Sequence, residues 1–159
     1  MNNYMKLEIA AVGCNEGFAR SAVAAFALTL NPSLAELSDI KTAVSEAVTN
    51  CVVHAYAHNG EQKKILISCQ AEAQDDGGVL HIEITDFGCG IPDVDKAVQP
   101  FFTTLENEER SGMGFTIMQT FMSNFSLISE DGKGTTVKMT KKIGGQRPQN
   151  SQEKERVDA

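Results

Sequence analysis

The sequence predicts an α+β fold, a two-layer α/β sandwich in which a mixed, mostly antiparallel sheet is covered on one face by about three helices. Short runs of alternating apolar and polar residues indicate strands with one buried face. Longer segments with apolar residues three and four positions apart indicate amphipathic helices. Strand-like and helix-like segments are partly segregated along the chain. This segregation favours two layers over a doubly wound parallel sheet.

The composition is that of one ordinary domain. The chain has 159 residues, 42% hydrophobic and 22% charged, and no apolar run approaches the ~20 residues of a spanning helix. A net charge of −7 argues against direct binding to nucleic acid. Because no signal peptide is recognisable and the four cysteines lack metal-ligand spacing, we expect a cytoplasmic protein without a membrane anchor. We expect residues 1–143 to form the domain and residues 144–159 a disordered polar tail.

The first two elements are a strand and a helix. Apolar and polar residues alternate from Met5 to Ala11, which indicates a strand. Asn15 can cap the following helix, which ends at Asn31-Pro32. The predicted apolar stripe of this helix consists of Phe18, Ala19, Ala22, Val23, Phe26, Ala27 and Leu30. On its early turns, Glu16 and Arg20 fit an exposed ion pair worth a few tenths of a kcal/mol.

The second helix organises the rest of the chain. Ser33 and Glu36 fit a capping box at its start, and the helix should run to about Tyr56. Glu46, Asn50 and His54 recur at four-residue steps, so they share one face as a base, a neutral oxygen ligand and a switchable donor or acceptor. A solvated polar face is the alternative. The predicted buried stripe consists of Ile40, Ala43, Val44, Ala47, Val48 and Cys51.

The second half of the chain alternates between strands and turns. Two strands, 63–73 and 79–85, form a hairpin, and two more, 125–129 and 135–142, follow a helix that opens near residue 111. Residues 93–109 have weak periodicity and are expected to form a long loop or short-helix region.

Three features in this framework suggest one site. Asp86-x-Gly88-x-Gly90 follows a buried strand, so a ligand could rest directly on its backbone while Asp86 accepts a hydrogen bond from an exocyclic amine. Gly112-Met-Gly114 precedes a helix whose N-terminus could hold phosphate oxygens. The third feature is the pair Glu46 and Asn50 described above. Taken singly, the two glycine motifs fit a tight turn and a glycine-rich helix entry equally well.

In this order, the motifs resemble the Bergerat-type ATP-binding fold shared by gyrase, the Hsp90 chaperone, histidine kinases and the MutL repair protein. The resemblance covers roughly residues 5 to 142. Within that superfamily, the chain is similar to the switch-protein serine kinases, which include anti-sigma factors of spore-forming bacteria. The segments that carry this similarity are Ser45-Glu-Ala-Val-Thr-Asn50, Asp86-Phe-Gly-Cys-Gly-Ile-Pro92, Phe102-Thr-Thr104, Glu109-Arg-Ser-Gly-Met-Gly-Phe-Thr-Ile-Met118 and Gly134-Thr-Thr136.

The resemblance implies a site for ATP or ADP with Mg²⁺. Glu46 would be the general base, Asn50 would bind Mg²⁺, and Arg110 would contact the γ-phosphate or a partner near it. Glu16, Arg20 and Thr49 become candidate partner contacts. The residues implied to line the nucleotide are Asn50, His54, Asp86, Gly88, Gly90, Ile91, Thr104, Ser111, Gly112, Met113, Gly114 and Thr135.

The resemblance also implies a homodimeric regulator with two activities. It would bind a sporulation sigma factor of the sigma F type and block access to RNA polymerase. As a protein serine/threonine kinase of the non-specific class, it would use Mg-ATP to phosphorylate a serine of an anti-anti-sigma factor. Two alternatives stay open: a stress-response switch kinase for another sigma factor, and a nucleotide-gated binding module without kinase activity. Glu46 favours a kinase, because binding alone needs no base.

Overall fold

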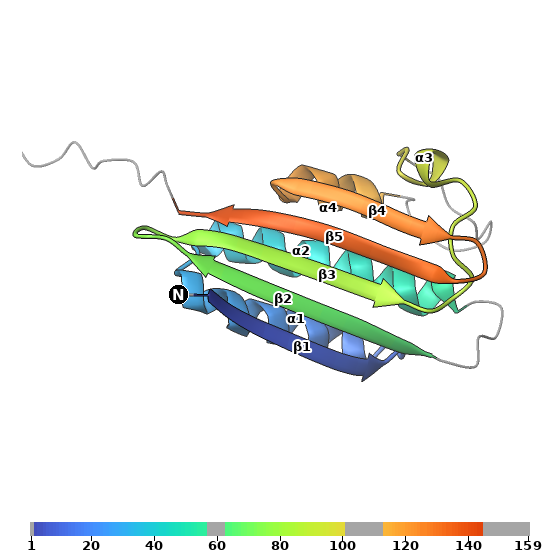
Figure 1. The fold of residues 1–159 in the computed structure, drawn as a ribbon, viewed down its shortest axis with the longest axis horizontal. Coiled ribbons are helices and arrows are strands. Elements are labelled where there is room, and N and C mark those ends of the chain that lie inside the picture. Colours follow the sequence, from blue (N-terminus) through green and yellow to red (C-terminus); the bar gives the residue numbers. More distant parts are fainter. Residues whose placement is uncertain (1, 57–62, 101–112, 145–159) are drawn as a thin grey trace, which may run out of the picture.

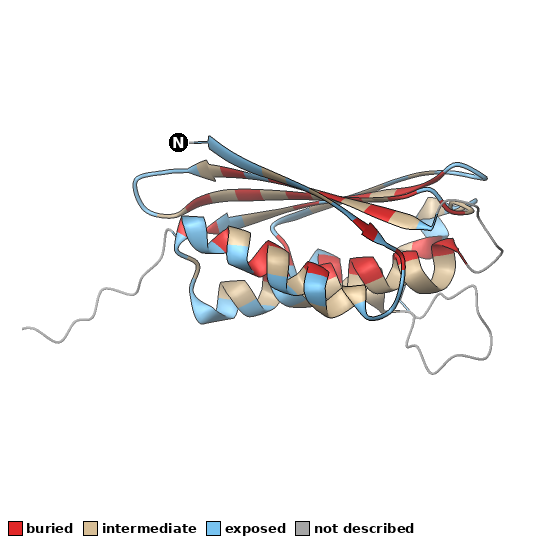
Figure 2. Ribbon diagram, turned by 90° about the horizontal axis from the view of Figure 1, so that it is seen from below, coloured by how far each residue is buried: buried red, intermediate tan, exposed pale blue. Residues whose placement is uncertain are grey.

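The computed structural model describes residues 2–56, 63–100 and 113–144. Within them, five strands form one sheet and the long helices α1 and α2 lie on one of its faces (Figures 1 and 2). The helices are α1 (Asn15–Ala27), α2 (Leu34–Asn50), α3 (Val94–Ala97) and α4 (Gly114–Phe121), with a 3₁₀ turn η1 (Leu28–Leu30) and a π-helical turn η2 (Cys51–Ala55). The predicted α+β sandwich is therefore confirmed, with the four-residue α3 as an addition.

Every strand pair in the described part of the sheet is antiparallel, and the strand order is β1-β2-β3-β5-β4. The β3–β5 pairing sets Asp86 opposite Thr135, at one end of the sheet. The sequence motif that follows β3 is thereby brought beside the start of β5. The strands are β1 (Asn2–Ala10), β2 (Lys64–Ala73), β3 (Gly78–Asp86), β4 (Asn124–Glu130) and β5 (Gly134–Ile143).

The core lies between the sheet and the helices. Alternate residues of β2 and β3 point inward and are buried, and the apolar ones among them, such as Ile67 and Ile82, are at most 1% exposed. Figure 2 shows buried residues of α1 and α2 turned toward the sheet. The predicted stripe of α2 is confirmed in full, because all six of its residues are buried. The stripe predicted for α1 is too wide: Phe18 is 53% exposed, and Ala24 is buried instead.

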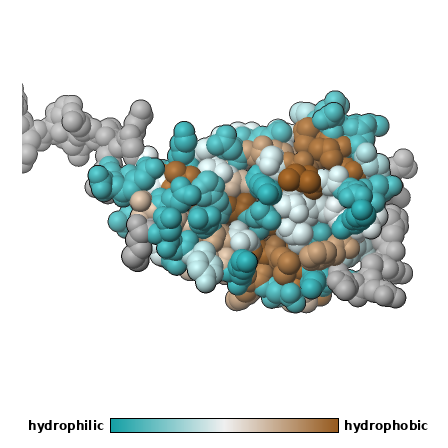
Figure 3. All heavy atoms as spheres, in the orientation of Figure 1, coloured by the Kyte–Doolittle hydropathy of each residue, from teal (hydrophilic) through white to brown (hydrophobic). Residues whose placement is uncertain are grey.

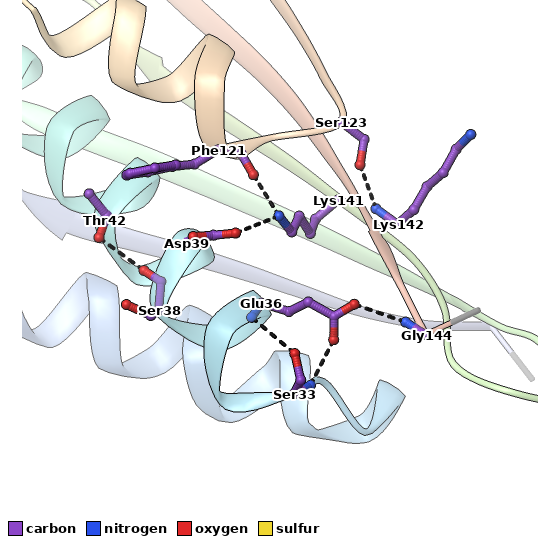
Figure 4. Close-up of polar contacts among 10 residues, drawn as sticks. All are labelled: Ser33, Glu36, Ser38, Asp39, Thr42, Phe121, Ser123, Lys141, Lys142 and Gly144. Atoms are coloured by element: carbon purple, nitrogen blue, oxygen red, sulfur yellow. Dashed lines mark hydrogen bonds and ion pairs between the residues drawn. The ribbon is translucent and has the colours of Figure 1, made fainter. Parts of the chain in front are cut away.

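The N-terminus of α2 is tied to the end of β5 (Figure 4). The predicted capping box is confirmed: Ser33 Oγ accepts from the Glu36 N–H at 3.2 Å, and Glu36 Oε2 accepts from the Ser33 N–H at 2.7 Å. The other carboxylate oxygen of Glu36 accepts from the Gly144 N–H at 3.1 Å. Partial burial alone raises the pKa of Glu36, but the hydrogen bonds from Ser33 and Gly144 outweigh it and lower the pKa. Lys141 adds an ion pair of 2.9 Å to Asp39.

The other face of the sheet carries polar side chains in cross-strand pairs. Glu83 Oε2 lies 3.3 Å from Lys138 Nζ, and the hydroxyls of Thr85 and Thr136 are 3.0 Å apart. Figure 3 shows this face as hydrophilic side chains interspersed with smaller hydrophobic areas. No helix of the described ranges combines the length and apolar character of a membrane span.

Candidate functional site

Glu46 and Asn50 lie one turn apart on α2, where the start of α4 reaches them. A Cβ placed on Gly114, the first residue of α4, would lie 3.2 Å from Glu46 Oε2 and 3.3 Å from Asn50 Nδ2. Glycine therefore lets the α4 backbone approach the carboxylate and the amide closely. Met113 is the N-cap residue of the same helix. Two of the three features that the sequence placed in one site, the Glu46–Asn50 pair and the glycine motif before α4, are thus close together.

The last turn of α2 widens into the π-helical turn η2, and this turn supports the glycine loop after β3. The Ala55 carbonyl accepts from the Cys89 N–H at 2.8 Å, and the His54 carbonyl accepts from the Cys89 thiol at 3.5 Å. A Cβ on Gly88 would lie 2.1 Å from the Ala55 oxygen, so only glycine fits this contact. Single π turns in α-helices are often found at functional sites. Here the turn joins the helix of Glu46 to the loop of Gly88.

Asp86 is buried at the end of β3 and held by three donors. Its Oδ1 accepts from the Gly88 N–H at 3.0 Å and from the Thr135 N–H at 3.2 Å. The buried Cys51 thiol adds a hydrogen bond. Burial raises the pKa of Asp86, and the bonds from Gly88, Thr135 and Cys51 oppose that rise. A carboxylate fixed in this way suits recognition of a donor such as an exocyclic amine.

The end of the glycine loop is locked to β4 and β5. Gly90 has φ +73°, and a Cβ there would lie 2.1 Å from the Glu130 oxygen. The Ile91 N–H donates to Ser129 Oγ at 2.7 Å, and that hydroxyl lies 2.8 Å from Thr135 Oγ1. Gly90, Ile91 and Thr135 thus gather around the sheet end that carries Asp86.

Three supporting residues were missed by sequence reasoning. Tyr56 donates its hydroxyl hydrogen to the Lys64 carbonyl and accepts from the Phe87 N–H at 2.9 Å, bracing the start of the glycine loop. Ser129 and Cys51 act on the loop and on Asp86, as described above. In the sequence, Cys51 is only a small residue in an apolar stripe, and Ser129 carries no local motif. The one sequence signal for Tyr56 was its place as an aromatic residue at the predicted end of the helix.

The candidate partner contacts lie on the outer side of the helices. Arg20 forms the predicted ion pair with Glu16 at 3.2 Å, and its Nη1 also lies 3.4 Å from Ser45 Oγ on α2. Thr49 is half-buried one turn after Ser45. The remaining predicted site residues lie outside the described ranges, namely Thr104, Arg110, Ser111 and Gly112.

A hollow of about 340 Å³ lies beside Asp86, but it opens on the uncovered face of the sheet. Its walls include Phe87, Ile128 and Thr136, which alternate with the inward-facing residues of their strands. Asp86 itself alternates with Thr85 and points to the helix side, where the Cys51 thiol of η2 bonds to its carboxylate, so we place the candidate ligand on the side of η2 and α4.

The residues present fit a nucleotide bound with Mg²⁺. Asn50 offers a neutral oxygen beside the Glu46 carboxylate and the α4 N-terminus. Mg²⁺ typically takes few protein ligands and completes its shell with phosphates and water. Among the described residues there is no cluster of three histidine, cysteine or acidic residues that could hold a metal. Asn50 is placed where it could share an ion with the phosphates of a bound nucleotide.

Comparison with known proteins agrees with this geometry. Residues 15–141 match the histidine kinase-like ATPase domain, which implies nucleotide binding. The chain is 53% identical over 146 residues to an anti-sigma F factor of Caldanaerobacter subterraneus subsp. tengcongensis, covering 92% of this chain and 98% of that protein. It is 46% identical over 143 residues to an anti-sigma F factor of Bacillus licheniformis, covering 90% and 94%.

A solved structure shows the same fold. The crystal structure of the RsbU and RsbW domains of Rv1364c from Mycobacterium tuberculosis matches with a TM-score of 0.64 at 19% identity, covering 91% of this chain and 33% of that one. With the domain match and the near-complete coverage of its relatives, this chain belongs to the anti-sigma F factors of the histidine kinase-like ATPase family.

Proposed function

We propose that the protein is an anti-sigma factor and a protein serine kinase. It binds a sporulation sigma factor of the sigma F type and, using Mg-ATP, phosphorylates a serine of an anti-anti-sigma factor. The observation that carries the kinase proposal is the contact of Gly114 with both Glu46 and Asn50. A module that only binds a nucleotide needs hydrogen-bond donors to the phosphates at this point. It does not need a carboxylate base beside them. The names of the relatives support the sigma-factor partner.

In this proposal the chain's own groups position the reactants. Asp86 and the Gly88–Gly90 loop hold the adenine, and the N-terminus of α4 binds phosphate oxygens. Asn50 would hold Mg²⁺, which neutralises phosphate charge when bound. Glu46 accepts the proton of the serine hydroxyl as the seryl oxygen bonds to the γ-phosphorus. The bond to the bridging oxygen breaks and ADP leaves, so most of the catalysis is positioning and charge neutralisation.

The assembly belongs to the same proposal. We expect a homodimer, and β1 is a candidate pairing surface because it is an edge strand of the sheet. In the proposed cycle the sigma factor and the serine protein compete for this assembly.

A transfer assay tests the kinase proposal. The protein is mixed with γ-labelled Mg-ATP and either the anti-anti-sigma protein or a copy with alanine at its acceptor serine. We expect label on the serine protein alone. Glu46→Gln should reduce transfer by roughly 10²–10⁴-fold without loss of nucleotide binding, because a general base is removed. Glu83→Gln, on the open sheet face, is the matched control and should keep full transfer.

The outcomes separate the alternatives. Full transfer by Glu46→Gln removes Glu46 from the role of base. Nucleotide binding without transfer by the natural protein favours the nucleotide-gated binding module. Capture from lysate of a sigma factor other than the sigma F type favours the stress-response switch kinase.

A further inference from the structure

A lysine stands among the apolar residues on the inner face of β5. Val137, Met139 and Ile143 point into the core and are at most 5% exposed. Lys141 belongs to the same alternating row, and only 12% of its side chain is exposed. A lysine is rarely covered to this extent unless its charge is paired. The proposed nucleotide site does not use this residue, so its place in the inward-facing row has another reason.

Lys141 joins three elements at one nitrogen atom (Figure 4). Its Nζ forms an ion pair of 2.9 Å with Asp39 of α2. The same Nζ donates to the carbonyl of Phe121, the last residue of α4, at 2.6 Å. Carbonyls in the last turn of a helix lack partners within the helix, and a cation there interacts favourably with the helix dipole. Lys141 therefore binds the C-terminus of α4 and ties it to α2.

The turn after α4 is also attached to β5. The Ser123 N–H donates to the Thr140 carbonyl at 2.8 Å. Ser123 Oγ accepts from the Lys142 N–H at 2.9 Å. These bonds hold the C-terminal end of α4 to the strand, and the side chain of Lys141 extends the attachment to α2.

The same two helices meet again at the candidate site, where a Cβ on Gly114 would lie 3.2 Å from Glu46 Oε2. Gly114 and Phe121 are seven residues apart on α4. Asp39 and Glu46 are also seven residues apart on α2. Seven residues make about two turns, or about 10 Å, and return to nearly the same helix face. The two antiparallel helices are thus held at two matching points, with Lys141 at one and the candidate site at the other.

We propose that Lys141 is a positioning residue that sets where α4 lies along α2. Without its ion pair and its bond to the α4 carbonyl, α4 can shift, and its N-terminus then moves relative to Glu46 and Asn50. Such a shift displaces the backbone amides that are proposed to bind phosphate oxygens. This role deepens the proposed function and rests on it, because it acts through the same phosphate-binding contact.

Lys141→Met tests this role in the full chain, because methionine is apolar and adapts to the surrounding core. We expect Tm to change by only a few degrees, since replacing such an ion pair by an apolar side chain is often neutral. The kcat of phosphotransfer and the affinity for Mg-ATP should each fall about three- to tenfold, because a misplacement of about 1 Å costs about 10²-fold and this shift is smaller. The KM for the acceptor protein should stay the same. Lys142→Met is the matched control, because it removes the same charge at the next, exposed position of β5.

Two further variants separate positioning from simple stabilisation. Lys141→Arg keeps a cationic donor and should recover most of kcat and of the ATP affinity. Gly114→Ala crowds the contact with Glu46 and Asn50, so it should lose less rate in the Lys141→Met background, where α4 can move away, than in the natural protein. Gly114 and Phe121 are separated by about 10 Å along α4. Independent sites at such a separation have multiplicative effects on rate.

An unchanged ATP affinity in Lys141→Met would overturn the proposal, and so would equal losses in Lys141→Met and Lys142→Met. Multiplicative effects of Lys141→Met and Gly114→Ala would also contradict it. If the natural protein transfers no phosphate, calorimetry with Mg-ATP still tests the positioning role. Weaker binding by Lys141→Met that Lys141→Arg restores would then support the role of Lys141, while the kinase proposal fails.

Discussion

Replacing Gly114 by alanine should separate stability from function. The new Cβ would lie 3.2 Å from Glu46 Oε2 and 3.3 Å from Asn50 Nδ2, closer than an ordinary contact of 3.4–4 Å, so these side chains must move by a few tenths of an ångström. A misplacement of about 1 Å costs about 10²-fold in rate, so this smaller shift should lower kcat by roughly three- to tenfold.

The same substitution should not weaken the fold. Gly114 has an ordinary negative φ at the first turn of α4, where alanine stabilises a helix by at most about 1 kcal/mol. In a chain of this size that raises Tm by about 2–4 °C at most. The expected pattern is therefore equal or higher Tm with slower transfer. A drop in activity that follows a drop in Tm would indicate simple unfolding.

Gly17→Ala provides the matched control. Gly17 lies in α1, and a Cβ there would meet only an Arg20 nitrogen at 3.6 Å, an ordinary contact. Its Tm should change in the same direction while transfer stays at the natural rate. Transfer by Gly114→Ala that equals transfer by Gly17→Ala would refute the inference that α4 approaches Glu46 and Asn50 closely for catalysis.

Two further predictions concern the carboxylates of Asp86, at the end of β3, and Glu36, in the first turn of α2. Asp86→Asn should weaken ATP binding about tenfold or more in calorimetry, because a carboxylate acceptor becomes an amide; Asp131→Asn, in an exposed turn, should bind normally. Glu36 has a folded pKa below its ordinary value of 4.5, so its contribution to stability is present above the unfolded pKa and is lost as pH falls through the folded pKa. Urea midpoints should therefore be higher for the natural protein than for Glu36→Gln near pH 7, and the gap should close under acid. A gap that is constant from pH 7 to pH 3 would show that the charge of Glu36 does not stabilise the α2–β5 connection.

Local patterns predicted most of the framework. All five strands were predicted because one buried face imposes a two-residue period. The capping box located the start of α2 because it depends only on residues three apart, Ser33 and Glu36. The exposure of Phe18 was not predicted, since the apolar row on α1 is wider than the strip that α2 and the sheet cover. The spacing of apolar residues in the sequence does not give the width of the covered strip.

The supporting contacts of the site depend on residues far apart in the chain. Cys51 reaches Asp86 across 35 positions, and the hydroxyl of Tyr56 reaches Phe87 across 31. The apolar residues of the π-helical turn η2 have the spacing of an α-helix, so the sequence does not distinguish the two. The difference lies in the hydrogen bonds, which in a π turn span five residues. The motifs identified Asp86 and Gly88, but the groups that hold them in place emerged only from the packing.

The π turn explains how the two halves of the candidate site keep one geometry. Because Ala55 and His54 direct their carbonyls at Cys89, the glycine loop rests on the same helix that carries Glu46 and Asn50. Both carbonyls belong to the last turn of the helix, where carbonyl groups lack partners within the helix and can accept hydrogen bonds from the loop. The distance between the proposed adenine-binding residues and the proposed base is then set by one helix and not by two independent loops. Gly114 comes from another part of the chain, so its distance to Glu46 and Asn50 is not set by that helix. For this reason Gly114→Ala is the most informative substitution.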